Sequence, residues 1–235
     1  MSISTEILVN NKPVDTYYHN NKTYIEGRKG SSYVIRIKNL SSDRKKIVVS
    51  VDGLNVISGD NDWTKGYVIS GHEIINIPGW LKNDQQAAKF VFSDVKKSYN
   101  QHNLSGNVNN VGVIGVLVYD EQPVNQYIPL SGQYRAFGEG GSSDGIGSFS
   151  GILRSSGSVN NINQLEQQSV GTGWGKATDF KTTSVSFNAN SYQSQTVTIF
   201  YDSRKGLESR GIVLNRVKNN PNPFPGYAGY CPEPH

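Results

Sequence analysis

The sequence predicts an all-β protein: an N-terminal antiparallel β-sandwich, a Gly/Ser-rich arm and a small β-containing C-terminal segment. Three observations support this fold class. Charged residues make up only 18% of the chain, and 25 glycines accompany many asparagines and serines. Glycine and asparagine tolerate positive φ and therefore favour turns. Between these turns lie short segments in which apolar and polar residues alternate, as they do in half-buried strands.

The first strands are expected at 4–9, 13–18 and 23–26, and a clearer one follows at 32–38. In this last segment three apolar residues alternate with more polar ones, so one face is expected to be buried. The segment 47–51 lies just beyond a polar turn. We expect it to be the antiparallel partner of 32–38 in a β-hairpin.

Further strands are expected at 54–57, 66–70, 73–77, 87–93 and 111–119. The last of these is apolar on both sides, which is typical of a buried central strand. About eight short strands at this spacing indicate a β-sandwich, assigned to residues 1–120. The residues expected in its core are Ile35, Val49, Phe90, Phe92, Ile114 and Val116.

Residues 121–168 form the predicted arm or linker, because glycine, serine and asparagine dominate them. Its apolar residues are too frequent for a spacer and too sparse for an independent core. We therefore expect a neighbouring chain to cover them. These predicted interaction residues are Tyr127, Ile128, Leu130, Tyr134, Phe137, Phe149, Ile152 and Leu153.

Residues 169–235 are assigned to a short β segment with a proline-rich tail. Strands are expected at 180–187 and 194–201. One or two helical turns are expected at 204–210, ended by Gly211. The single cysteine, Cys231, leaves no intrachain disulfide, so the fold must depend on its core.

Charge and hydropathy restrict the possible partners. The formal net charge is only +4 and the basic residues are scattered, which argues against nucleic acid. No apolar run approaches the length of a membrane span, and the polar start of the chain predicts no cleavable export signal. The neutral polar composition favours a virion or an extracellular assembly over the cytoplasm.

No catalytic, cofactor-binding or metal-binding residue is predicted. The four histidines are far apart, and the chain has no HExxH, CxxC or GxSxG motif. Asp60-Asn61-Asp62 offers oxygen ligands, but it lacks the spacing and the final glutamate of an EF-hand. We expect a hydrated turn there.

The segment Gly171-Thr172-Gly173-Trp174-Gly175-Lys176 superficially matches a phosphate-binding loop. Its glycine spacing is wrong, and alanine follows the lysine where serine or threonine would be needed. We expect a tight glycine turn with Trp174 as a packing residue. A different ligand surface is conceivable at Trp63, Tyr67 and Trp80, which could form an aromatic platform for a glycan.

Several motifs resemble one uncharacterised family of bacterial hypothetical proteins. They are Val51-Asp52-Gly53-Leu54-Asn55-Val56, Gly66-Tyr67-Val68, Pro78-Gly79-Trp80, Val111-Gly112-Val113-Ile114-Gly115-Val116, Gly171-Thr172-Gly173-Trp174-Gly175, Tyr201-Asp202-Ser203 and Asn222-Pro223-Phe224-Pro225-Gly226. The resemblance implies no reaction. It does imply that the segments before and after the arm form one working unit.

Taken together, these features predict a non-catalytic structural or interaction protein. We expect a homo-oligomeric component of a surface assembly, such as a virion, filament or envelope. Its partners would be copies of itself or other assembly proteins. The alternative is a carbohydrate- or cell-surface-binding β-sandwich module.

Overall fold

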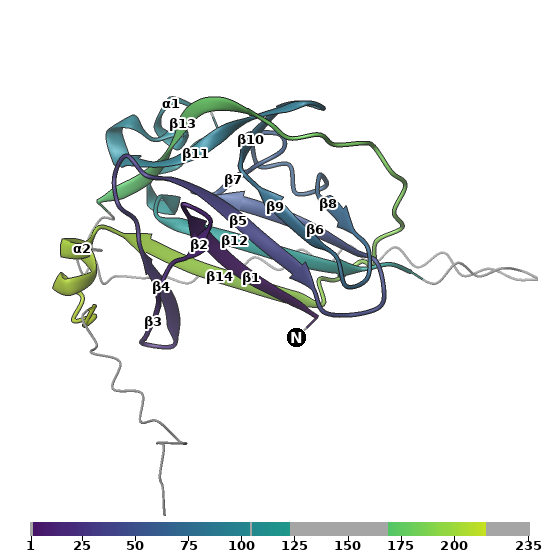
Figure 1. Cartoon of the computed structure of the whole chain (residues 1–235), viewed down its shortest axis with the longest axis horizontal. Helices are drawn as coiled ribbons and strands as arrows, with labels where there is room; N and C mark the ends of the chain where they lie inside the picture. The colour runs from purple at the N-terminus through teal and green to yellow at the C-terminus, as the bar shows by residue number, and fades with distance from the viewer. Residues whose placement is uncertain (1, 104, 123–168, 215–235) are drawn as a thin grey trace, which may run out of the picture. The chain divides into compact units, whose positions relative to one another are not determined.

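The computed structural model describes residues 2–103, 105–122 and 169–214, in which fourteen strands form two seven-stranded sheets (Figure 1). The two sheets face one another across one apolar core, to which both contribute side chains. The predicted all-β, sandwich-like fold class is therefore confirmed. The predicted arm at 121–168 lies outside the described residues, apart from its first two.

The first sheet is antiparallel throughout. Its central strand β5 pairs with β1 on one side and with β9 and the middle of β11 on the other. At the border of the sheet, β13 pairs with β11 along almost its whole length. The strands of this sheet are β1 (Ile3–Val9), β2 (Lys12–Pro13), β5 (Ser32–Asn39), β9 (Ile74–Ile77), β10 (Gly79–Asn83), β11 (Gln86–Asp94) and β13 (Val170–Asp179).

The second sheet is mixed, because β14 runs antiparallel to β12 but parallel to β4. A parallel pair needs a long crossover connection, which fits strands so distant in the chain. The strands of this sheet are β3 (Thr16–His19), β4 (Lys22–Glu26), β6 (Lys45–Val51), β7 (Leu54–Asn55), β8 (Tyr67–Ile69), β12 (Val113–Asp120) and β14 (Gln195–Asp202).

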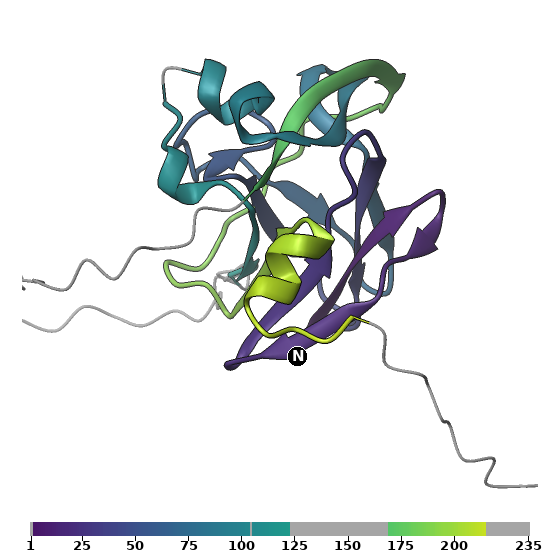
Figure 2. The same ribbon diagram turned by 90° about the vertical axis from the view of Figure 1, so that its left-hand side faces the viewer.

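Short helices cover the ends of the sheets (Figure 2). They are the 3-10 turns η1 (Val95–Lys97) and η2 (Val108–Asn110) and the helices α1 (Tyr99–His102) and α2 (Arg204–Ser209). Helix α2 begins where the backbone N–H of Gly206 donates to the Ser203 hydroxyl, 3.1 Å away. The chain leaves it at Gly211, which has a φ of 77°. The predicted helical turns and their glycine stop are confirmed.

The core contains every residue that the alternation pattern placed there. All six are at most 1% exposed: Ile35, Val49, Phe90, Phe92, Ile114 and Val116. Stacked rings fill the space between the sheets, with the Tyr33 ring 4.3 Å from that of Phe92 and 5.1 Å from that of Phe90, centroid to centroid. Aromatic side chains bury the most apolar area per residue, so they account for much of the stabilisation.

The predicted hairpin between 32–38 and 47–51 is wrong. The first segment is β5 in the first sheet, where it pairs with β1. The second is β6 in the other sheet, where it pairs with β12. The alternation of apolar and polar residues shows which face of a strand is buried. It does not show whether two such strands pair within one sheet or lie in two sheets that face each other across the core. The connection between β5 and β6 therefore crosses from one sheet to the other.

The C-terminal strands complete both sheets rather than form a separate segment. Strand β13 extends the first sheet, and β14 lies between β12 and β4 in the second. The described residues before and after the predicted arm, 2–121 and 169–214, therefore belong to one unit. The strand expected at 180–187 is also wrong, since this stretch is extended without strand pairing. The backbone N–H groups of Phe180 and Thr182 donate to the backbone carbonyls of Gln85 and Asp84, respectively.

Candidate functional site

Strand β13 contains the glycine-rich segment expected to be a tight turn, and that expectation is wrong. The segment is part of a ten-residue strand. Its glycines alternate with larger residues, which is the period of a strand. A Cβ at Gly171 would approach the Ser98 Cβ to 2.7 Å, and one at Gly175 would approach the Lys89 carbonyl to 2.7 Å. The glycines are thus required because neighbouring chain segments lie close on that face.

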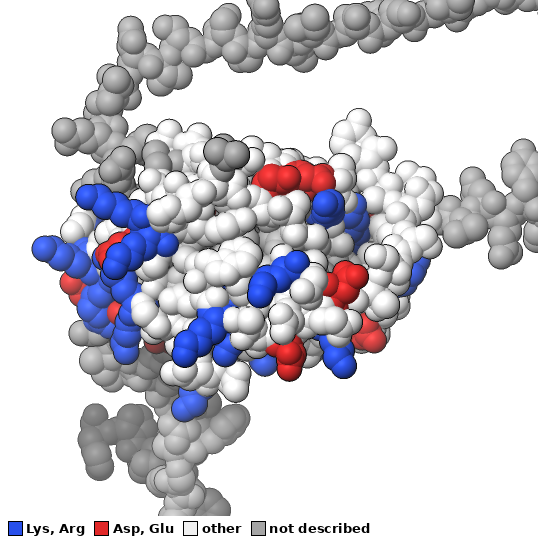
Figure 3. Space-filling view, turned by 90° about the horizontal axis from the view of Figure 1, so that it is seen from above, with Lys and Arg blue, Asp and Glu red and all other residues white. Residues whose placement is uncertain are grey.

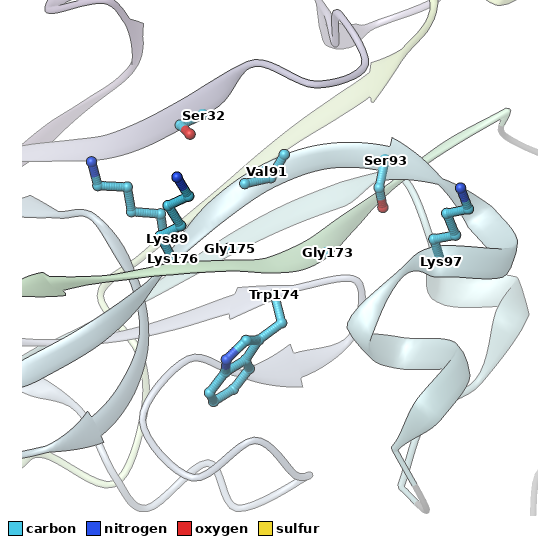
Figure 4. A pocket seen from close by; sticks show the side chains of 9 residues that line it. All are labelled: Ser32, Lys89, Val91, Ser93, Lys97, Gly173, Trp174, Gly175 and Lys176. Atoms are coloured by element: carbon cyan, nitrogen blue, oxygen red, sulfur yellow. The ribbon is translucent and has the colours of Figure 1, made fainter.

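A β-bulge in β13 determines where its lysine points. Ala177 pairs with Ala88 and Trp174 pairs with Phe90, so Gly175 and Lys176 both lie opposite the single residue Lys89. The extra residue shifts the side-chain alternation by one place. As a result, the Lys176 side chain lies on the same side of the sheet as Lys89, while the Trp174 ring lies on the other side of the strand (Figure 4).

These side chains line a shallow groove of about 430 Å³ on the outer face of the first sheet. Three lysines lie around it, from three different elements: Lys89 on β11, Lys97 in η1 and Lys176 on β13. In Figure 4, Lys89 and Lys176 lie together at one end and Lys97 lies near the other end, beside Ser93. The residues that line this lysine groove are Ser32, Lys89, Val91, Ser93, Lys97, Gly173, Trp174, Gly175 and Lys176.

The three lysines are exposed, and none has an ion-pair partner among the described residues. The carboxylate of Asp94 lies close by, but it pairs with Lys29. Lys29 lowers the pKa of Asp94, with a smaller contribution from Lys97. Seen from above, Lys and Arg side chains gather at one end of the molecule, with some Asp and Glu side chains among them (Figure 3). The lining of the groove thus carries three positive charges and no negative one.

Strand β13 is held at its buried end by the carboxylate of Asp52. Asp52 lies in the turn between β6 and β7, with a φ of 51°. One carboxylate oxygen accepts hydrogen bonds from the Gly112 backbone N–H at 2.8 Å and the Tyr201 hydroxyl at 2.5 Å. The other accepts the backbone N–H of Thr172 at 2.7 Å. This single side chain thus joins β13 of the first sheet to β14 of the second and to the residue before β12.

The hydroxyl of Thr172 continues this network on β13. It is hydrogen-bonded to the Tyr33 hydroxyl at 2.7 Å and to the Tyr201 hydroxyl at 2.6 Å. The Asn100 side-chain amide of α1 donates to the Asp52 carbonyl at 2.6 Å. We call these four buried residues, Tyr33, Asp52, Thr172 and Tyr201, the Asp52 cluster. Because its polar groups are paired, the cluster fixes β13 rigidly.

Burial changes the titration of the Asp52 cluster. Desolvation raises the pKa of Asp52 to about 6, although the hydrogen bonds from Tyr201, Thr172 and Gly112 oppose this rise. Desolvation also raises the pKa values of the Tyr33 and Tyr201 hydroxyls well above 10.0, and the nearby Asp52 adds to this effect. All four side chains are at most 1% exposed, so a substrate has no access to them.

The predicted aromatic platform does not form. Trp80 is 1% exposed and Tyr67 is 8% exposed, while Trp63 is 41% exposed. Both buried rings belong to the apolar core, as aromatic residues in strands usually do. A different aromatic series reaches the surface. The Tyr99 ring lies 4.7 Å from Trp80 and 5.0 Å from the exposed ring of Trp174.

The remaining predicted positions have varied outcomes. The eight interaction residues from Tyr127 to Leu153, and Cys231, lie outside the described residues. Asp60 and Asp62 form side-chain turns in which each carboxylate accepts a backbone N–H at 2.9 Å, from Asp62 and Thr64 respectively. These bonds and those of the neighbouring hydroxyls lower the pKa values of both carboxyls. In the described part of the chain, no group of three His, Cys, Asp or Glu residues is placed to hold a metal ion.

A second cavity, of about 660 Å³, lies between residues 64–68 and the extended stretch 180–187. Two of its lysines already have partners. The Lys46 ammonium donates to the Thr64 carbonyl at 2.6 Å, and Lys65 lies 3.9 Å from Asp62. None of the three ammonium groups of the lysine groove has such an ion pair or carbonyl acceptor among the described residues, and the groove is therefore the stronger candidate for a ligand site.

Comparisons with protein-family models, curated proteins and solved structures give no match. The resemblance to a bacterial family therefore stays a prediction. No helix in the described ranges has the length and apolar character needed to cross a membrane.

The lysine groove cannot be recognised from the sequence, for a specific reason. Lys89 and Lys97 have no unusual neighbours in the sequence, and Lys176 was considered only as part of a phosphate loop. In an unbroken strand, Lys176 would lie on the same side as Trp174. Only the bulge at Gly175-Lys176 brings it beside Lys89. The one feature of the sequence that indicates the groove is Lys176, which directly follows three alternating glycines.

Proposed function

We propose that this protein is a non-catalytic interaction protein that binds anionic groups of another macromolecule in the lysine groove. The observation that carries the proposal is the arrangement of Lys89, Lys97 and Lys176. Three elements present them around one groove, and none of them forms an ion pair with a carboxylate of the described chain. Cations held without internal partners are available to pair with a ligand.

The lining of the groove favours binding over catalysis. It contains no aspartate, glutamate, histidine or cysteine that could transfer a proton or act as an acidic catalyst. Its lysines are exposed, whereas a lysine that acts as a nucleophile or base is usually desolvated. The buried carboxylate of Asp52 is closed off from solvent.

The support beneath the groove also favours binding. Thr172 lies four residues before Lys176 on β13 and is fixed by the Asp52 cluster. A rigid strand loses little conformational entropy when a ligand binds to it. The groove therefore presents its charges in a preorganised array, although each lysine side chain remains free to adjust.

Self-association, which the sequence predicts, is a second candidate function. It is favoured by the exposed apolar residues Tyr18 and Val213, which line a groove of about 400 Å³ beside the edge strand β3. Light scattering after size-exclusion chromatography tests it. If this surface joins copies, Tyr18→Lys with Val213→Lys converts an oligomer into a monomer. An unchanged oligomer would exclude this surface.

The main proposal is tested with two variants of equal net charge. One removes the groove lysines (K89Q/K97Q/K176Q); the other removes three exposed lysines elsewhere (K12Q/K38Q/K205Q). Binding of labelled dextran sulfate, polyglutamate and polyphosphate is measured by fluorescence anisotropy at low salt. We expect at least one polymer to bind the native chain and the control variant, and to bind the groove variant at least about tenfold more weakly. Equal binding by both variants would contradict the proposal.

A further inference from the structure

The lysine groove is elongated, and its charges are spread along it. Lys89 and Ser93 are four residues apart on β11, which corresponds to about 13 Å of strand. Lys97 lies beyond Ser93, whereas Lys176 lies beside Lys89 (Figure 4). A site for one phosphate or one carboxylate needs its donors to converge on a point. Here the cations suit a linear ligand that carries several separated charges.

The floor of the groove has few large side chains and contains two hydroxyl groups. Val91 is its only aliphatic side chain, and Gly173 and Gly175 contribute only backbone. The hydroxyls of Ser32 and Ser93 face the same groove, and that of Ser93 also donates to the Asp94 carbonyl at 3.3 Å and the Gly171 carbonyl at 3.4 Å. Hydroxyls both donate and accept hydrogen bonds, so this floor matches a ligand that is rich in hydroxyl groups itself.

Two other classes of linear polyanion fit less well. Single-stranded nucleic acid is held by aromatic rings on which its bases stack, but the Trp174 ring lies on the far side of β13 (Figure 4). An acidic peptide can also pair with a cluster of basic side chains, but its backbone lacks the hydroxyl groups of a sugar chain. Val91 already has strand neighbours on both sides, Ser32 of β5 and Gly173 of β13, so no strand can be added to β11 along the groove.

We infer that the ligand of the lysine groove is a linear acidic polysaccharide, with carboxylate or sulfate groups along a hydroxyl-rich chain. This inference rests on the proposed function, because it assigns the chemical class of the anionic partner. The acidic groups pair with Lys89 and Lys176 at one end of the groove and with Lys97 at the other. The sugar hydroxyls bond to Ser32 and Ser93 between them.

The inference is tested by calorimetry on the full chain with oligogalacturonates and sulfated oligosaccharides of increasing length. An octasaccharide reaches both ends of the groove, so we expect it to bind at least about tenfold more tightly than a disaccharide. Three ionic contacts predict roughly 20-fold weaker binding when the salt concentration rises fourfold. The variant S32A should weaken octasaccharide binding about fivefold, through one lost hydrogen bond.

Matched probes and variants separate the possible failures. Polyglutamate and oligothymidylate carry similar charge without the sugar hydroxyls, and neutral dextran carries the hydroxyls without charge. Binding of the octasaccharide must be lost in K89Q/K97Q/K176Q and kept in K12Q/K38Q/K205Q. If polyglutamate or oligothymidylate binds as tightly with the same lysine dependence, the polysaccharide assignment is wrong and the proposed function stands. If no anionic polymer depends on the groove lysines, both are wrong.

Discussion

The Asp52 cluster and the lysine groove lie on the same strand but use polar groups in opposite ways. At the start of β13, the backbone and hydroxyl of Thr172 are hydrogen-bonded within the protein. Four residues later, Lys176 is exposed and has no acidic partner among the described residues. A buried polar group must be paired to be tolerated, whereas an exposed one need not be. The polar groups of β13 that are hydrogen-bonded within the protein therefore stabilise the fold, and those without an internal partner are available to a ligand.

The largest effect on stability is expected when a carboxylate is buried without hydrogen-bond donors like those that pair with Asp52. Ile114 is fully buried and pairs with Val51, next to Asp52 in the chain. Ile114→Asp should abolish folding, because an unpaired buried carboxylate costs several kcal/mol against a typical total stability of about 5–15 kcal/mol. Circular dichroism and solubility measure the result. Ile114→Val, which should lose only about 0.5–1.5 kcal/mol, is the control. A folded, soluble Ile114→Asp protein would contradict the claim that a buried carboxylate must be paired.

A smaller effect is expected from the pH dependence of stability. The pKa of Asp52 is about 6 in the folded protein, whereas an aspartate in the unfolded chain has its ordinary value of 3.8. The folded protein therefore binds this proton more tightly than the unfolded chain does. As pH rises from about 4 to about 6, the free energy of unfolding should fall by about 3 kcal/mol, and this stabilisation is absent at higher pH. Urea unfolding at several pH values measures the change.

The variant Asp52→Asn isolates this contribution. Asparagine accepts the positive φ of Asp52 but does not titrate, so the backbone strain of the site is unchanged. The difference in unfolding free energy between the native chain and the variant should vary with pH only in the window from about 4 to 6. A difference that is constant across this window would show that Asp52 does not titrate there.

The smallest effect on stability is expected in the lysine groove. Replacing Lys89, Lys97 and Lys176 by glutamine should change the free energy of unfolding by less than about 0.5 kcal/mol per site, since exposed side chains without partners contribute little. Urea unfolding at neutral pH measures it, beside the control K12Q/K38Q/K205Q. A loss of several kcal/mol would indicate that the groove is part of the structure rather than a binding surface.

The sequence predicts individual strands well and their neighbours poorly. Period-two alternation correctly identifies the buried face of 32–38 and the six core residues. It does not say which strands pair, and so the β5–β6 connection was expected to be a hairpin. Strand β13 was missed because its glycines resemble a turn, and glycine is usually unfavourable within a strand. There it serves close packing against Ser98 and Lys89.

The candidate site was harder to predict than the fold. Asp52-Gly53 is a dipeptide typical of a turn, and the chain does turn there. Nothing local indicates that its carboxylate would be buried against Thr172 and Tyr201, which lie 120 and 149 residues further along the chain. The lysine groove depends on a one-residue bulge, and strand periodicity alone cannot place a bulge.

The parallel pairing of β4 with β14 also has a consequence for synthesis. Thr23 pairs with Ile199, so β4 leaves the ribosome well before its partner exists. At about 5–20 residues per second, the delay is roughly 10–35 s. Pairings between such distant segments also fold slowly, because the loop must close before the contacts form. Until β14 arrives, one side of β4 remains an open edge, and the newly made chain depends on β3 alone to cover the other.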